Sequence, residues 1–348
     1  MDTHQLHSSQ LTQWVHNLPK AELHLHLEGA IPIEALWGLI QKYGGDPSVA
    51  SKEELVGRLT YETFPDFIET WIWKNGFLRT YDDFEFIAES IARDLLRQNI
   101  LYAEMFFSPS RFSEQGLTTK GLAEAIRSGF KKVPGVEIWL IADLVRDHGP
   151  VRAEQTLEEA AAAKEFGIVG IGMGGSEHLH PPKPFKKVYE EARQMGFKTS
   201  VHAGEAAGSE SVWGALLDLE VDRIGHATRA EEDASLLEHL QKEATPLELC
   251  PLSNVATGVI PSYQEHPVRR YWEQGLKLTI NTDDPGMFHN HLSDEYIGLM
   301  DHFNFTPEDI QQFILNALES SWRPGTDSEK SLAKQFQAHP NWTPPGLD

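Results

Sequence analysis

The sequence is poor in cysteine, in basic residues and in long hydrophobic runs, and each shortage excludes something. Its single cysteine, Cys250, excludes a disulfide within the chain and suits a reducing compartment such as the cytoplasm. No apolar run approaches the length of a membrane span, and the first residues contain no apolar core of a signal peptide. Against 52 acidic residues stand only 30 basic ones, a net charge of −22, which argues against nucleic acid or an anionic membrane as a partner.

What the sequence does contain is an alternation of short β-like runs with charged, helix-like stretches. Strands that alternate with helices favour a parallel sheet, and eight such units favour a closed (β/α)8 TIM barrel. We therefore predict a single α/β barrel domain over residues 1–348. The eight β-like runs cover residues 21–29, 100–108, 136–144, 167–175, 197–205, 223–228, 246–254 and 276–284.

One long interval interrupts this rhythm after the first run. Residues 31–99 look helical and are rich in aromatic side chains. One interpretation is a helical insertion with a small core of its own. The other is a lid-like insertion that roofs the site, because it follows the first strand at the end of the barrel where active sites lie.

Metal-ligand residues stand at the ends of three of the runs. His24 and His26 lie two residues apart, so a strand there places both imidazoles on one face. This spacing alone could be accidental among 16 histidines. However, His202 ends the fifth run and Asp283 the eighth, and the C-terminal strand ends of a barrel lie together. Three imidazoles and one carboxylate suit a catalytic Zn²⁺ with a position left for water, so we predict one zinc ion per chain.

Four further residues near these strand ends are candidates for proton transfer or substrate binding. His226 could take a proton from a metal-activated water, or be a hydrogen-bonded core histidine. Glu205 could act as an acid in a dry pocket, or be a solvated loop charge. Asp284 could bond a substrate ring nitrogen, or steer His226 or the metal ligands. The Gly175 N–H could donate to a heterocycle, or the glycines there could serve only a tight turn.

Five sequence blocks, which span nearly the whole chain, resemble those of the adenosine and adenine deaminases: PKAELHLHLEGA, SVHAGEAAGSESVWGAL, RIGHATRA, LELCPLSNVATGV and TINTDDPGMF. The resemblance implies one Zn²⁺ held by the four predicted ligands and hydrolytic loss of ammonia from C6 of a 6-aminopurine. It implies Glu205 as the proton shuttle to purine N1 and His226 as the residue that orients the attacking oxygen. It also implies that Asp284 meets N7 and that the Gly175 amide meets N3.

The chain departs from the adenosine deaminase pattern on the substituent side of the purine. Glu28 follows HLHL, where adenosine deaminases usually carry an aspartate that faces the ribose; glutamate is more typical of adenine deaminases and of other branches. Gly172 and Ser176 occupy places that are more often acidic. The segment 63–111 looks like bacterial members whose substrate can be a larger adenine nucleoside. Lys74 or Arg111 could then meet an acidic tail, or both could be surface charges.

We expect a small-molecule hydrolase that converts a 6-aminopurine nucleoside, adenosine first, to inosine and ammonia. Adenine, giving hypoxanthine, and 6-aminodeoxyfutalosine, an intermediate of menaquinone synthesis, are the alternatives within this class. Another TIM-barrel metallohydrolase with two metals would commonly need a carboxylate or a modified lysine at the end of the fourth run, which is glycine-rich here. A non-catalytic binding barrel would be expected to lack a metal ligand or the acid.

Overall fold

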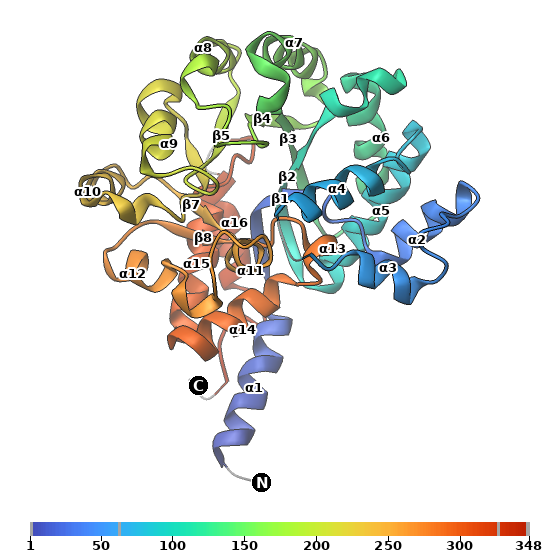
Figure 1. The fold of residues 1–348 in the computed structure, drawn as a ribbon. Helices are drawn as coiled ribbons and strands as arrows, with labels where there is room; N and C mark the ends of the chain where they lie inside the picture. The colour runs from blue at the N-terminus through green and yellow to red at the C-terminus, as the bar shows by residue number, and fades with distance from the viewer. Residues whose placement is uncertain (1–2, 62–63, 326–327, 346–348) are drawn as a thin grey trace.

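The computed structural model describes residues 3–61, 64–325 and 328–345. Eight parallel strands form one sheet in chain order (Figure 1), which confirms the predicted (β/α)8 fold. Every strand lies inside one of the predicted runs or begins one residue before it. The strands are β1 Lys20–His26, β2 Ile100–Phe107, β3 Glu137–Asp143, β4 Ile168–Gly172, β5 Lys198–Ala203, β6 Arg223–His226, β7 Leu247–Leu249 and β8 Leu278–Ile280.

The sheet closes on itself just beyond the end of β8. The N–H of His26 donates to the carbonyl of Asp283 at 2.9 Å, and the N–H of Asp283 donates to the carbonyl of His24 at 3.2 Å. Leu23, Leu25 and Leu27 alternate with these histidines along the chain and are fully buried. Closure therefore places residues from the two ends of the chain side by side at the C-terminal end of the barrel.

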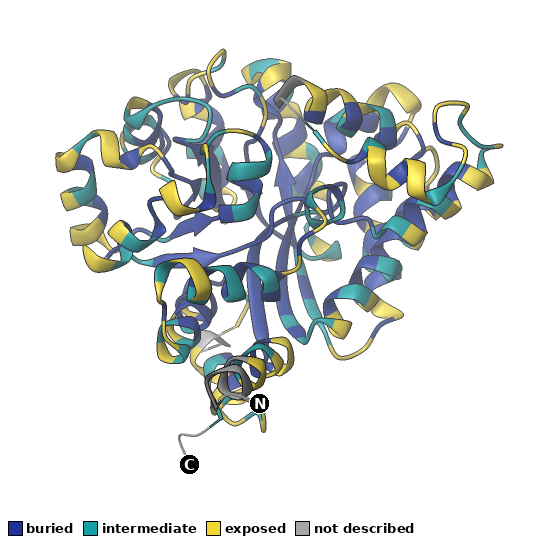
Figure 2. Cartoon of the chain, turned by 60° about the horizontal axis from the view of Figure 1, so that its bottom comes forward, coloured by how far each residue is buried: buried dark blue, intermediate teal, exposed yellow. Residues whose placement is uncertain are grey.

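Helices surround the barrel, with their inner faces buried and their outer faces exposed (Figure 2). The first half of the chain forms α1 Thr3–Asn17, α2 Ile33–Lys42, α3 Lys52–Arg58, α4 Phe64–Asn75, α5 Tyr81–Arg97, α6 Thr119–Lys131, α7 Gly149–Ala162 and α8 Lys186–Gln194. The second half forms α9 Ser209–Gly214, α10 Ala234–Glu243, α11 Pro251–Ala256, α12 Val268–Glu273, α13 Pro285–Phe288, α14 Leu292–Phe303, α15 Pro307–Glu319 and α16 Ser328–Gln337. Helices α2 to α5 lie between β1 and β2, within the long interval of residues 31–99 that the sequence predicts to be helical.

Helix α5 shows how the local sequence sets these elements. It begins with a capping box in which the Thr80 N–H donates to the Asp83 carboxylate at 2.8 Å. Arg97 stands in its last turn, where a cation is favourable to the helix dipole. Its apolar residues recur at helical spacing and form a buried face toward the barrel and α6.

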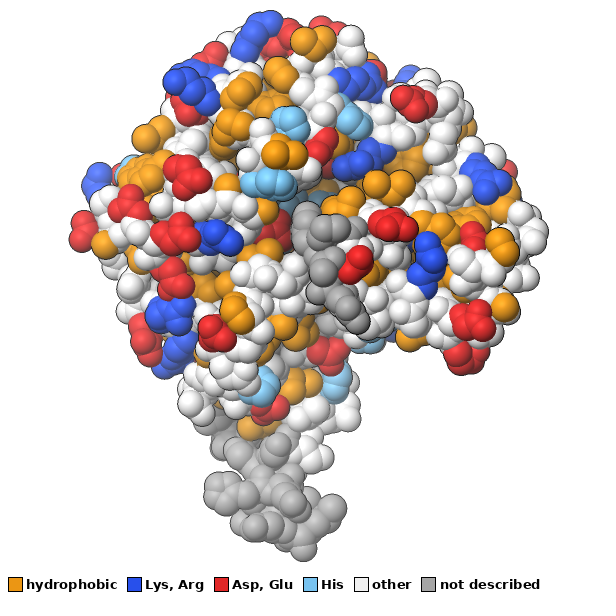
Figure 3. Space-filling model, viewed as in Figure 1, with side chains coloured by type: hydrophobic (Ala, Val, Ile, Leu, Met, Phe, Trp, Pro, Cys, Tyr) orange, Lys and Arg blue, Asp and Glu red, His pale blue; other side chains and the backbone are white. Residues whose placement is uncertain are grey.

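Charged side chains of both signs are spread over the face drawn in Figure 3, with histidine and hydrophobic side chains near its centre. Within the part of the chain that the structure describes, every helix is too short or too polar to cross a membrane.

The close approach of α5 and α6 depends on Gly129. A Cβ at this position would overlap the backbone carbonyl of Glu85 and lie 2.8 Å from the Cβ of Ala88. We expect Gly129→Ala to lower the free energy of unfolding by about 1–3 kcal/mol, because one helix must shift. Gly57 in α3 has open space around it, so Gly57→Ala should be neutral or stabilising by about 0.5–1 kcal/mol. Denaturant unfolding of both variants measures the difference, and equal effects would contradict this account.

Candidate active site

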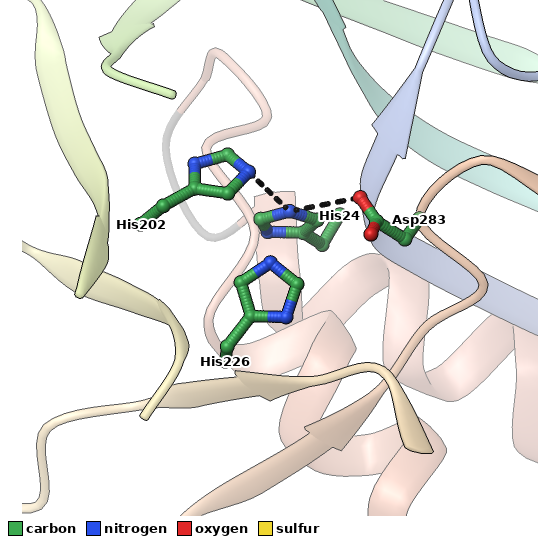
Figure 4. A group of neighbouring side chains, drawn as sticks. All are labelled: His24, His202, His226 and Asp283. Carbon is green, nitrogen blue, oxygen red and sulfur yellow. Dashed lines mark hydrogen bonds and ion pairs between the residues drawn. The ribbon is translucent and has the colours of Figure 1, made fainter. Parts of the chain in front are cut away.

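Four side chains from three strand ends meet at the C-terminal end of the barrel. His24 and His26 on β1 each place Nε2 3.1 Å from Nε2 of His202 on β5. Asp283, just beyond β8, places Oδ1 3.5 Å from Nε2 of His24 and 3.2 Å from Nε2 of His26. Figure 4 shows His24, His202 and Asp283 facing one another, with His226 beside them. The structure thus brings together all four of the ligands that the sequence predicts.

The donor atoms fit a metal ion. Ligands bonded to zinc at about 2.0–2.1 Å in a tetrahedron are roughly 3.3–3.5 Å apart, close to the spacing seen here. Nδ1 of His24 lies 2.8 Å from the Glu248 carboxylate, which fixes the proton on Nδ1 and leaves a lone pair on Nε2. The imidazole lone pairs and the charge of the Asp283 carboxylate repel one another at these distances. A cation bound between them would remove that repulsion. His24, His202, His226 and Asp283 also have ligand atoms within 4.8 Å of one another, so His226 stands at the same centre.

A buried network of charged side chains holds the Glu248 carboxylate that contacts His24. Arg223 on β6 lies between two carboxylates, with Nε 2.6 Å from Glu248 of β7 and Nη1 2.7 Å from Glu104 of β2. The three side chains are almost completely buried, and the guanidinium stacks 3.5 Å over the ring of Trp322. Removing one charge would leave the others uncompensated, so the network holds Glu248, and through it His24, in one position.

Two residues of the site have left-handed backbone conformations that are uncommon outside glycine: His226 has φ 62° and Asp283 has φ 69°. Side chains from α11 hold both of them. The Ser253 hydroxyl donates to Oδ2 of Asp283 at 2.7 Å, and Asn254 Nδ2 lies 3.1 Å from Nδ1 of His226. Local strain of this kind persists where surrounding contacts fix it, commonly at active sites.

The neighbours of His226 also fix its tautomer. His266 Nε2 lies 3.3 Å from Oδ1 of Asn254, so the amide turns its NH2 toward His226 and donates to Nδ1. Burial lowers the pKa of His226 to about 3, so the ring is neutral and carries its one proton on Nε2. That atom lies 3.6 Å from the Glu205 carboxylate. His226 is therefore arranged to donate a hydrogen bond to an oxygen beside the metal centre.

Glu205 lies in the loop after β5, facing this centre. Burial, followed by the nearby carboxylates of Asp283 and Glu177, raises its pKa to about 8, so it can hold a proton near neutral pH. Its loop is fixed by the buried carboxylate of Glu177, which accepts the four successive N–H groups of residues 204–207 at 2.6–3.1 Å. A protonated carboxyl on a rigid loop suits an acid catalyst.

Asp284 and Gly175 also face the space in front of the metal centre. Asp284 is 5 % exposed, and its Oδ1 atom has no hydrogen-bond partner among the described residues. Its carboxylate packs directly on Gly29, where any Cβ would overlap it. Gly175 has φ 105°, and a Cβ there would overlap the carboxylate of Asp147. Position 29 therefore requires glycine for space, and position 175 requires it for both conformation and space.

These groups open into one cavity of about 240 Å³. Helix α4 forms one wall with an apolar face, and the ends of the strands form the floor. The polar lining includes Glu205, His226, Asp283, Asp284, Asp143 and Arg111, and the apolar wall consists of Phe67, Ile68, Trp71 and Ile72. Such a mixture of an apolar wall and a few convergent polar groups is typical of a site for a small molecule.

Of the remaining candidates from the sequence, Glu28 and Lys74 do not line the cavity, whereas Arg111 does. Glu28 is fully buried, its Oε1 accepts the Ser108 N–H at 2.9 Å, and it is not among the described residues that line the cavity. Lys74 is 1 % exposed and donates to the Glu28 carbonyl, so it is neither a surface charge nor a wall of the cavity. Arg111 does line the cavity, with its guanidinium 4.7 Å from the ring centre of Trp71.

Several residues that hold the site residues in place were not predicted from the sequence. Ser253 and Asn254 stand in the block LELCPLSNVATGV, which was recognised without a role for either. Glu248 lies in the same block, also without an assigned role. Glu177 is an isolated glutamate in an acidic chain, so nothing in the sequence separates it from a solvated charge. Only the closed barrel shows that Glu248 faces inward beside His24.

Comparisons with known proteins agree with this geometry. The sequence model of the adenosine deaminase family matches residues 19–338. The adenine deaminase of Wolinella succinogenes is 32% identical over 316 residues, covering 90% of this chain and 95% of that protein, and the adenine deaminase of Caulobacter vibrioides is 34% identical over 328 residues, covering 93% and 94%.

Solved structures give the same result. The crystal structure of adenine deaminase from Arthrobacter aurescens has a TM-score of 0.85 and 27% identity, covering 92% of this chain and 98% of the other. An amidohydrolase from Burkholderia ambifaria with bound zinc has a TM-score of 0.85 and 27% identity, covering 93% and 91%.

The contact between Glu248 and His24 leads to a test of the metal centre. Glu248→Gln should weaken zinc binding by about 10–100-fold, because the charged partner that orients His24 is lost. Competition with a chromophoric chelator measures this affinity. Glu104→Gln is the matched control, since it breaks the same buried network without touching His24. Equal losses in both variants would mean that the network, rather than the Glu248–His24 contact, sets the affinity.

Proposed function

This chain belongs to the adenosine deaminase family of metal-dependent aminopurine deaminases, and from that premise we propose that its substrate is the free base adenine, hydrolysed to hypoxanthine and ammonia. The convergence of three imidazoles and one carboxylate, with Glu205 and Asp284 in the same cavity, is the observation that carries the chemistry. The sequence favoured adenosine as the first substrate; the relatives and the environment of Glu28 support the base instead.

His24, His26, His202 and Asp283 would hold one zinc ion. When bound, the ion supplies the Lewis acidity that brings the pKa of a water toward about 7. His26 belongs to this set because its Nε2 atom lies as close to His202 as that of His24 does. His226, whose Nδ1 is occupied by Asn254, is left to orient the attacking oxygen.

The remaining residues would bind the purine and move its protons. Glu205 holds the proton that it delivers to N1, which makes C6 more electrophilic. Asp284 faces N7, and the Gly175 N–H faces N3. Water adds at C6 and the amino group leaves with a proton as ammonia, so adenine and water give hypoxanthine and ammonia. The apolar face of α4 excludes bulk water from these steps.

Glu28 supports the free base over the nucleoside. In the resemblance stated above, the residue at this position faces the ribose. Here its carboxylate is fully buried and is not among the described residues that line the cavity, so a sugar hydroxyl in the cavity would not meet it. The cavity, at about 240 Å³, is also below the roughly 300–1,000 Å³ typical of pockets for drug-sized ligands. All the curated relatives compared above are named adenine deaminases.

Replacement of Glu205 tests the chemistry. Glu205→Gln should lower kcat by about 10²–10⁴-fold, because the proton donor to N1 is lost. Bound zinc should stay the same, since the side chain is not one of the four ligands. Steady-state ammonia release and metal analysis of the same sample give both values. Glu210→Gln, an exposed glutamate that follows the same loop, should leave the rate unchanged, and an active Glu205→Gln enzyme would remove Glu205 from the mechanism.

A substrate panel tests the identity of the substrate. Ammonia release is measured with adenine, adenosine and 6-aminodeoxyfutalosine at matched concentrations. We expect kcat/KM for adenine to exceed that for either nucleoside by at least 10-fold, equivalent to about 1.4 kcal/mol. A higher value for adenosine or 6-aminodeoxyfutalosine would overturn the assignment of the base while leaving the deaminase chemistry in place.

A further inference from the structure

Helix α4 carries a lysine in a place that is unusual for a charged side chain. Lys74, in the last turn, is 1 % exposed. Its ammonium donates to the backbone carbonyl of Glu28 and lies 3.3 Å from Oδ1 of Asn75. Burial lowers the pKa of Lys74 to about 8, and the charges of Asp284 and Glu28 oppose that shift. An ammonium is rarely buried to this extent unless its contacts compensate for lost water.

The carbonyl that Lys74 contacts belongs to the turn that follows β1. This turn forms the wall behind Asp284. Gly29 packs directly on the Asp284 carboxylate, and the Gly29 carbonyl accepts the N–H of Gly286 at 2.9 Å. Lys74 therefore lies one residue away from the surface that positions the proposed N7 contact, although its own side chain does not line the cavity.

The same helix forms the apolar wall of the cavity. Trp71 and Ile72 lie just before Lys74 on the chain, and both line the cavity. Two cations lie near the ring of Trp71, with the Lys74 ammonium 5.5 Å and the Arg111 guanidinium 4.7 Å from the ring centre. Ile72, by contrast, is 57% exposed, so burial of apolar surface fixes this part of the helix only in part.

The negative charges of two buried carboxylates, Glu28 and Asp284, stabilise the Lys74 ammonium. Oε2 of Glu28 and Oδ1 of Asp284 have no hydrogen-bond partner among the described residues. Unpaired buried oxygens of this kind are costly, and a nearby positive charge reduces the cost. If α4 moved away, the ammonium would gain water but the two carboxylates would lose that charge. The lysine thus couples the position of the helix to the groups behind the substrate.

We propose that Lys74 is a positioning residue that docks α4 over the cavity and holds the Glu28–Gly29 turn against Asp284. The helix and the turn then form one unit, and binding of the purine requires the docked arrangement. Loss of the ammonium lowers the population of that arrangement and so weakens apparent affinity for substrate. The docking contact itself does not depend on which aminopurine is the natural substrate.

Lys74→Met, which keeps the apolar stem without the charge, tests this role. We expect KM for whichever aminopurine is turned over to rise about 10-fold or more, with kcat changed less than about threefold and zinc content unchanged. Amide hydrogen exchange in residues 64–75 should accelerate at least about 10-fold, while exchange in α15 stays the same. The control is Lys242→Met, at a lysine whose side chain is 80% exposed on α10. Unchanged KM and exchange in Lys74→Met, or loss of protection throughout the barrel, would overturn the proposal.

The single native cysteine permits a chemical rescue. Cys250 is fully buried, so Lys74→Cys introduces the thiol that 2-bromoethylamine should modify, restoring an ammonium of nearly lysine length. The aminoethylated protein should recover the low KM and the slow exchange of α4, whereas the same variant treated with neutral iodoacetamide should not. Equal behaviour of the two adducts, or an introduced thiol that stays unreactive because α4 remains docked without the charge, would contradict a role for the ammonium.

The unaltered protein provides an independent measurement. Under mildly denaturing conditions, amides of residues 28–30 and of α4 should exchange through a common opening with the same free energy and the same dependence on denaturant. Separate openings for the turn and the helix would show that they are not one unit, whatever the variants do.

Discussion

The hydrogen bonds that close the barrel between β1 and β8 are the contacts on which the rest of the site depends. They join the backbones of His24, His26 and Asp283, so the same pairing that completes the sheet also brings two imidazoles and a carboxylate together. A shift of register by one residue would turn the β1 histidines to the opposite face, away from Asp283. Metal binding and barrel closure are therefore two consequences of one strand alignment. His202 on β5 then completes the set from the opposite side of the barrel.

Charge compensation explains much of what surrounds this centre. Asp283, Asp284 and Glu205 crowd into one small cavity, and burial raises the pKa of both Glu205 and Asp284. A divalent cation held by the four predicted ligands would offset this concentration of negative charge, and the Lys74 ammonium interacts with the charge of Asp284. Below the centre, Arg223 balances two buried carboxylates. Burial of these acidic groups thus depends on a cation, a backbone donor or a proton that compensates their charge.

The sequence predicted the fold and singled out the four side chains that meet at the strand ends, because both follow from short-range patterns and from the positions of strand ends. Alternation of strand and helix identified the barrel, and the two-residue spacing of His24 and His26 required only that a strand exists there. The positions of Glu177, Glu248 and Glu28 could not be predicted in this way. Each depends on which neighbouring strand or loop offers a partner: a row of loop N–H groups, a histidine ring, or the Ser108 N–H. Such partners are long-range in sequence, so a single chain without its fold contains no signal for them.

The position of Glu28 connects substrate choice to the helical wall. Its Oε1 atom accepts the Ser108 N–H and its carbonyl accepts from Lys74, so both contacts hold the turn at the edge of the cavity. Its second carboxylate oxygen, Oε2, has no hydrogen-bond partner among the described residues, but the side chain is fully buried and does not line the cavity, so a sugar hydroxyl in the cavity would not reach it. The contact that docks α4 and the contact that holds the Glu28 carboxylate outside the cavity thus belong to one residue.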